Sequence, residues 1–122
     1  LKMESILDSI KKLLGIQKEY THFDSDLIIH INTALSVLTQ LGIGPTKGFS
    51  ISDNTSKWED FIGDDPRLES VRSFIYLKVK LLFDPPLSSA VIESINHMIG
   101  ELEWRLTIMA DTKQEEEKKD GK

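Results

Sequence analysis

Residues 65–86 read DPRLESVRSFIYLKVKLLFDPP, and this stretch decides the fold. Its apolar side chains recur at steps of three and four residues, which is the spacing of an α-helix. Two apolar lines run along that helix: Leu68, Val71, Ile75, Val79 and Leu82 form the first, and Phe74, Leu77 and Leu81 form the second. At about 100° per residue, the second line lies a quarter-turn or more from the first. Such a helix is either central in its own domain or buried by a neighbouring copy of the chain.

Both ends of this helix carry clear signals. Asp65 suits the N-cap, where a carboxylate accepts from free backbone N–H groups, and Pro66 suits the first helical position. Asp84 is followed by two prolines, which cannot continue a helix. These signals predict a helix over residues 66–83. They also explain Asp64 and Asp65 as helix-start residues rather than as a pair of catalytic carboxylates.

Two more helices are predicted before this one. The first covers residues 3–14 and ends at Gly15, with Lys11 and Lys12 opposite its apolar stripe. The second covers residues 24–41, where apolar side chains again recur at helical spacing.

A last long helix is predicted after the double proline, over residues 87–110. Its expected inner face consists of Val91, Ile95, Met98, Leu102, Leu106 and Met109, with Ile92 and Ile99 beside them. Trp104 and Ile108 lie away from that face. From Asp111 onward the chain has no apolar residue, so residues 111–122 are expected to form a charged, disordered tail.

The segment between the second and third long helices is less regular. Residues 42–48 read GIGPTKG, but they follow a helix instead of opening one, and the lysine precedes the last glycine. This order favours a helix stop and a turn over a phosphate-binding loop. Alternation over residues 49–51 predicts at most one short hairpin within residues 44–57. A short helical turn should follow, in which Trp58 and Phe61 pin the segment onto the helices.

The predicted fold class is therefore all-α: a small bundle of about four helices, with a short hairpin or irregular excursion after the second. The chain has 122 residues, which suits one domain, here residues 3–110. Its formal net charge is −5, which argues against a free-standing nucleic-acid-binding domain. There is no cysteine, which excludes disulfides and thiol chemistry, and no apolar run long enough to predict a membrane span.

Nothing in the sequence predicts catalysis. His22, His30 and His97 lack the spacing of metal ligands, and no serine lies in a nucleophile motif. We therefore expect no catalytic residue, no cofactor-binding residue, no metal site and no enzyme activity.

Two kinds of surface remain as candidates for binding. Apolar residues off the main stripes, namely Phe74, Leu77, Leu81, Trp104 and Ile108, are either second core contacts or a place where another chain docks. Arg67, Arg72, Lys78 and Lys80 give the 66–83 helix an excess of positive charge, but they do not form one stripe. Solvation of exposed faces is the simpler interpretation of these four, and weak contact with DNA phosphates is the alternative.

Four runs of the sequence together carry a family resemblance: LTQLGIGPTKGFSI at 38–51, TSKWEDFIGDD at 55–65, YLKVKLLFDPP at 76–86 and ELEWRL at 101–106. In these runs the chain resembles the head–tail connector, or adaptor, proteins of tailed bacteriophages and prophages. It is most similar to the small form from phages of Gram-positive bacteria. The resemblance extends from about Met3 to Leu106.

The resemblance implies a helical virion protein, made in the cytoplasm of the bacterial host, that assembles as a ring of commonly about twelve or thirteen copies. The ring would lie between the portal protein and the stopper or tail protein. It would extend the channel through which DNA passes, with transient and non-specific DNA contact. The alternatives are a regulatory or DNA-binding helical protein of a prophage, which needs a compact basic recognition helix, and a monomeric helical enzyme, which needs convergent polar groups.

Overall fold

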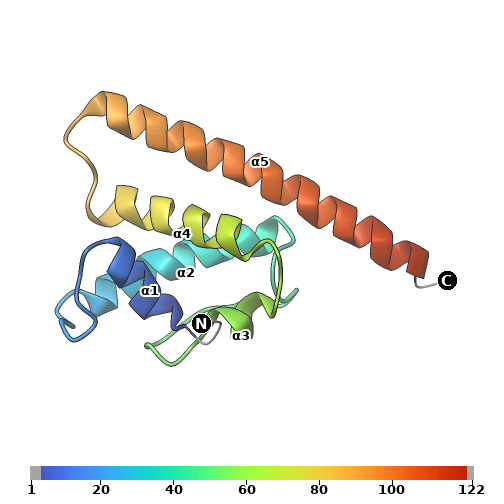
Figure 1. Ribbon diagram of the computed structural model, residues 1–122, viewed down its shortest axis with the longest axis horizontal. Helices are drawn as coiled ribbons and strands as arrows, with labels where there is room; N and C mark the ends of the chain where they lie inside the picture. Colours follow the sequence, from blue (N-terminus) through green and yellow to red (C-terminus); the bar gives the residue numbers. More distant parts are fainter. Residues whose placement is uncertain (1–3, 121–122) are drawn as a thin grey trace.

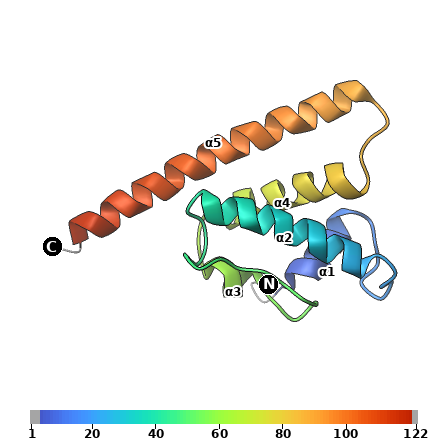
Figure 2. The same cartoon turned by 180° about the vertical axis from the view of Figure 1, so that it is seen from behind.

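The fold is all-α, as the sequence predicts. The computed structural model describes residues 4–120, with side chains for residues 4–111. Five helices lie in this part of the chain: α1 (Ile6–Leu13), α2 (Asp24–Gln40), α3 (Trp58–Ile62), α4 (Leu68–Phe83) and α5 (Ser89–Asp120). Helix α4 lies between α2 and α5, and α1 packs against α2 and α4 (Figures 1 and 2).

Helix α4 is the central element of the domain. It begins two residues later than predicted, although the carboxylate of Asp65 accepts a hydrogen bond from the backbone N–H of Arg67 at 2.8 Å. Both apolar lines of α4 contribute to one continuous core, in which Val71, Phe74, Ile75, Leu77 and Val79 are buried. Because α4 has α2 on one side and α5 on the other, its two apolar lines are covered within a single chain, except at Leu82, which is 53% exposed.

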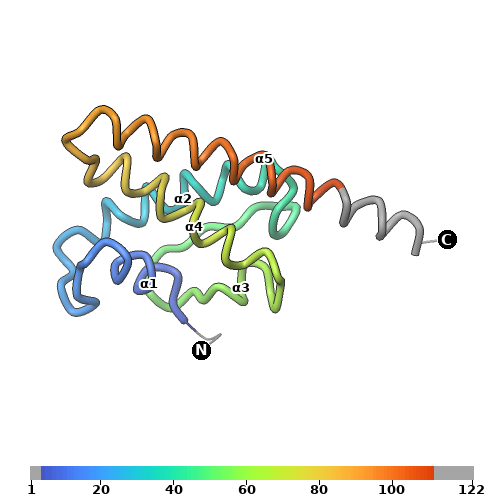
Figure 3. Tube along the Cα trace, turned by 45° about the horizontal axis from the view of Figure 1, so that its top comes forward, coloured from blue at the N-terminus to red at the C-terminus, as the bar shows by residue number. Residues whose placement is uncertain are grey.

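Helix α5 runs beside α4, but with a different face inward than the sequence suggested (Figure 3). Ile99, Leu106 and Ala110 are buried, whereas Val91, Met98 and Met109, which were expected inside, are exposed. The contact stripe instead runs through Ile95, Ile99, Leu102, Leu106 and Ala110. The helix also continues past Ala110 to Asp120, since the Lys, Gln and Glu residues there are good helix formers. The disordered tail over residues 111–122 stays a prediction, because the side chains of residues 112–122 lie outside the described part.

Helix α2 ends in the way that its glycine predicts. The backbone N–H of Gly42 donates to the carbonyl of Thr39, and that of Ile43 donates to the carbonyl of Leu38. These two bonds define a Schellman motif, which requires a left-handed residue after the helix, and Gly42 has φ +87°. Ile43 is then buried against the core beside Leu38. The GIGPTKG segment is thus a helix stop and turn.

The sequence allowed at most one short hairpin within residues 44–57, and the structure has the irregular alternative: in the described part of the chain this excursion contains no strand pair. The backbone N–H and C=O of Ile51 are both bonded by the side-chain amide of Asn32, at 2.8 Å and 2.9 Å. Because one side chain satisfies both groups, the extended stretch needs no partner strand. A single bridge joins Ser5 to Lys57 and holds the start of α1 beside α3.

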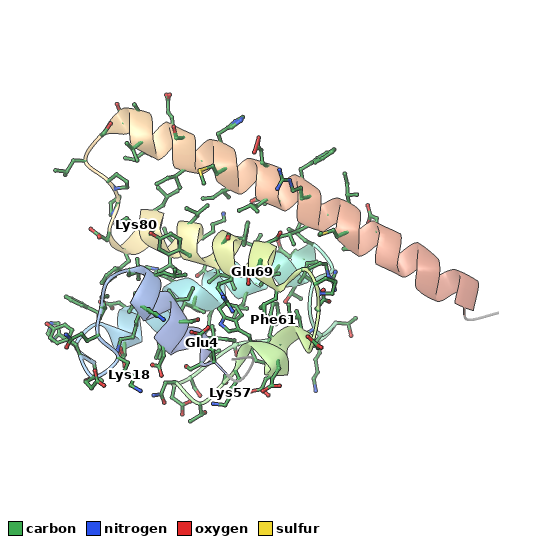
Figure 4. All side chains as sticks on the ribbon, viewed as in Figure 1. Glu4, Lys18, Lys57, Phe61, Glu69 and Lys80 are labelled. Carbon is green, nitrogen blue, oxygen red and sulfur yellow. The ribbon has the colours of Figure 1, made fainter. Side chains whose placement is uncertain are left out.

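Two aromatic residues anchor this excursion, as predicted. Trp58 and Phe61 are buried, and the indole N–H of Trp58 donates to the hydroxyl of Ser9 on α1 at 2.8 Å. Phe61, labelled in Figure 4, also lies against Gly44, where an added Cβ would overlap its ring. The glycine-rich turn and α3 therefore pack onto each other as one unit.

Lys11 corrects another expectation, because its side chain is buried although the helical periodicity places it on the polar face. Its ammonium donates to the backbone carbonyls of Lys18 at 2.9 Å and Tyr20 at 2.7 Å. It also forms an ion pair with the carboxylate of Asp24, at 2.9 Å. The loop between α1 and α2 wraps over this ammonium and supplies two of the three partners, and Asp24 of α2 supplies the third. One side chain thereby ties α1, the loop and the first residue of α2 together.

Candidate interaction surfaces

The apolar candidates divide into core and surface. Phe74 is fully buried and Leu77 nearly so, and Leu81 is partly buried against the same core. This corrects the idea that the second line of α4 forms an outer surface, because α5 of the same chain covers it. These three residues stabilise the domain and are not open to a second chain in this structure.

Trp104 and Ile108 are the surface candidates that remain. Trp104 is 67% exposed and Ile108 42% exposed. Taken at 100° per residue, they lie about 140° and 180° around α5 from the buried Ile99, so they face away from α4. We call this pair the outer α5 patch. An indole side chain stabilises a protein most when it is buried, so an indole this exposed to water is unusual.

A second exposed apolar surface was missed by sequence reasoning. It comprises Tyr20, Leu82, Leu87 and Val91, which we call the turn patch, and all four are about half exposed or more. The α1–α2 loop, the end of α4 and the α4–α5 connection lie at the same end of the molecule (Figure 1). Ring contacts join Tyr20 to Phe23 at 5.8 Å and Phe23 to Phe83 at 5.2 Å. No periodicity reveals this patch, because its members come from four different segments.

The four basic candidates all have acidic partners within the chain. Arg67 is buried and forms an ion pair with Asp65 at 2.6 Å. Arg72 lies over the ring of Trp58, 5.6 Å from its centroid, and its guanidinium nitrogens lie 3.5 Å from Glu4 and 3.8 Å from Glu69. Glu4 and Glu69 are labelled in Figure 4. Arg72 therefore holds the start of α4 beside α3 and the start of α1, whereas Arg67 pairs locally, just before α4.

Lys78 and Lys80 are more accessible. Lys78 lies 4.0 Å from Glu103 of α5, and Lys80 lies 2.9 Å from Asp84. Both pairs are partly exposed, and pairs of this kind stabilise a protein by only about 0–1 kcal/mol. These two lysines can therefore exchange their carboxylate for another anion, which the buried Arg67 cannot do as easily.

The remaining polar groups do not converge on a chemical site. His97 lies 3.5 Å from Glu101 on the surface of α5, and the ring of His22 packs edge-on against Phe23. Hydrogen bonds from Thr55 hold the pKa of the exposed carboxyl of Asp53 below its usual value, as in many surface turns. Among the described residues, no cluster of His, Asp and Glu could hold a metal ion. Within the same part of the chain, no helix is both long and apolar enough to cross a bilayer.

An open groove of about 550 Å³ lies along α1, between Glu4, Asp8, Lys12 and Lys18. Its charges are balanced, and it is lined by the α1–α2 loop that Lys11 holds in place. The groove lacks the enclosed apolar walls of a small-molecule site.

Fold and surfaces together define a small helical protein whose notable exposed features are apolar contact surfaces. A family model described as phage connector protein matches residues 6–113, from the first residue of α1 far into α5. The chain therefore belongs to the phage connector protein family. Comparisons with curated proteins and with solved structures give no match. The finer resemblance to the small form from phages of Gram-positive bacteria stays a prediction.

Proposed function

We propose that this protein is a structural component of the virion that forms a ring between the portal and the stopper or tail. The ring would extend the DNA channel while the head is completed. The observation that carries the proposal is the family match, which spans the whole helical fold. The copies would be made in the cytoplasm of the host and would end in the head–tail connector.

The two exposed apolar patches support this proposal. A closed ring of identical subunits needs two different surfaces on each copy, because each copy contacts one neighbour on either side. The outer α5 patch and the turn patch are two such surfaces. Neither resembles a catalytic site, so we propose that the protein acts by assembly, with no cofactor and no enzyme activity.

Contact with DNA would be weak and non-specific in this proposal. The net charge of −5 and the pairing of all four candidate basic residues limit phosphate binding. Lys78 and Lys80 are the two candidates that can release their partners as DNA passes. The alternative function, a DNA-binding regulator, is less well supported because α4 presents no free basic face to a groove.

Light scattering after size-exclusion chromatography, combined with electron microscopy of the purified protein, tests the proposal. We expect closed rings with a central hole, or a monomer that forms such rings when purified portal protein is added. A protein that remains monomeric with and without portal, and that binds a specific DNA sequence, would refute the ring and favour the regulator.

A further inference from the structure

We propose that neighbouring copies join by packing the outer α5 patch of one copy against the turn patch of the next. This inference rests on the proposed ring and specifies its contact. It assigns Trp104 and Ile108 to one side, and Tyr20, Leu82, Leu87 and Val91 to the other.

The two patches are well separated on one chain. The turn patch includes the connection before α5, whereas Trp104 lies fifteen residues after Ser89, or about 22 Å along the helix. They also face different directions, because the outer α5 patch points away from α4 and the turn patch caps one end of the domain (Figure 1). A chain cannot bring its own two patches together, so in the proposed ring a second copy supplies the partner surface.

Charge favours contact between unlike patches. The described charged residues exposed on α5 are Glu93, Glu101, Arg105 and Asp111, three acidic and one basic, a net charge of −2. Two outer α5 patches facing each other would bring two such surfaces together. The exposed charges at the other end nearly cancel, with Lys12 and Lys18 against Glu19, Asp26 and Asp84, a net charge of −1. A head-to-tail contact therefore brings less like charge together than a two-fold contact through α5 would.

The exposed apolar area fits a ring contact. A covered aromatic side chain buries about 150–250 Å², so the 67% of Trp104 now in water represents roughly 100–170 Å². Leu87 is 104% exposed, as much as in an extended chain, and has its whole side chain to bury. The patches are smaller than the roughly 800 Å² per partner of a standard stable interface. Each copy in a closed ring makes two such contacts, so each contact can be modest.

Two charge substitutions test the pairing. Trp104→Glu removes the outer α5 patch and leaves the turn patch intact, and Leu87→Glu does the reverse. Each variant alone should be a folded monomer with an unchanged circular dichroism spectrum and melting temperature. Ile29→Glu is the matched control, because Ile29 is 62% exposed on α2 and belongs to neither patch. This control should assemble like the unmodified protein.

Mixing the two variants gives the sharper result. The intact outer α5 patch of Leu87→Glu can still bind the intact turn patch of Trp104→Glu. We expect a one-to-one complex that grows no further, visible by light scattering. If each patch bound its own kind, one variant alone would still assemble and no such complex would form, which would overturn the inference.

The absence of cysteine allows a second, independent measurement. The double variant Arg105→Cys/Ser89→Cys places a thiol beside each patch at exposed positions and keeps Trp104 and Leu87; treated with a short bis-maleimide, it should give a ladder of covalent multimers. The matched pair Arg105→Cys/Ile29→Cys should not. Rings that persist in Trp104→Glu, or no ladder from protein that forms rings, would overturn this contact and leave the proposed function standing. Unmodified protein that forms neither rings nor a ladder, even with portal present, would overturn both.

Discussion

Lys11 offers the most direct test of how the domain is held together. Its ammonium is enclosed by the α1–α2 loop and makes two hydrogen bonds to carbonyls and one ion pair to Asp24. Replacing Lys11 by Met keeps a long linear side chain in the same space but removes all three interactions. The substitution therefore separates the contribution of the ammonium from the contribution of packing.

The expected loss follows from the partners. A hydrogen bond to a charged group contributes about 1.5–3 kcal/mol, and two carbonyls lose such a bond. The Asp24 side chain is a quarter exposed, so water replaces part of its ion pair with the ammonium when Lys11 is substituted. The Met side chain also avoids the cost of taking an ammonium out of water, which offsets part of the loss. We expect the free energy of unfolding to fall by about 2–4 kcal/mol, or roughly 6–16 °C in melting temperature for a domain of this size.

Urea denaturation followed by circular dichroism and tryptophan fluorescence measures this change. Lys12→Met is the matched control, because Lys12 is the next residue of the same helix and its side chain is exposed. We expect the control to stay within about 0.5 kcal/mol of the unmodified protein. Equal stability of Lys11→Met and Lys12→Met would refute the reasoning, since the buried ammonium would then contribute nothing.

The remaining predictions concern other parts of the core. Trp58→Ala should lower the free energy of unfolding by about 3–5 kcal/mol, because it empties a buried indole site; an unchanged urea midpoint would show that the excursion is not docked. Gly44→Ala should destabilise by about 2–4 kcal/mol, since φ is +85° and the new Cβ meets Phe61, whereas Gly15→Ala, at φ +81° in open space, should lose only about 1–2 kcal/mol. Similar losses of stability at the two glycines would argue against the close approach of Phe61 to Gly44. Asn32→Ala should cost about 1–3 kcal/mol by leaving Ile51 without its two hydrogen bonds, as measured by thermal melting. A chain that ends at Ala110 should melt at the same temperature as the full chain; a clear drop would assign residues 111–122 a part in folding.

The helices were predictable from sequence because each carries its own periodic signal and its own start or stop residues. Asp84 and the two prolines after it end α4 as expected, and Gly42 ends α2. The sequence left open whether the strand-like alternation around Ile51 belongs to a hairpin or to an irregular excursion, because its hydrogen bonds go to a side chain, that of Asn32, and not to a second strand. A local pattern does not show where its polar groups will find partners.

The surfaces were less predictable because exposure depends on what packs nearby. Phe74 and Leu77 lie off the main stripe of α4, but α5 returns across them and buries them. Lys11 lies on the polar side of α1 by periodicity, but the following loop folds over it. Trp104 was identified correctly as lying off the inner face, since α5 has no further helix on that side.

The sparse burial of α5 has a consequence for the dynamics of the subunit. Of its side chains from Ser89 to Asp111, three are buried: Ile99, Leu106 and Ala110. The first turns of this helix therefore have few contacts that must break before their amide hydrogens exchange with solvent, whereas α2 and α4 are held by the whole core. A neighbouring copy on α5 would supply the missing contacts and slow that exchange. In the proposed ring, part of the ordering of this helix would thus be completed by assembly, and folding and ring formation would share one entropic cost.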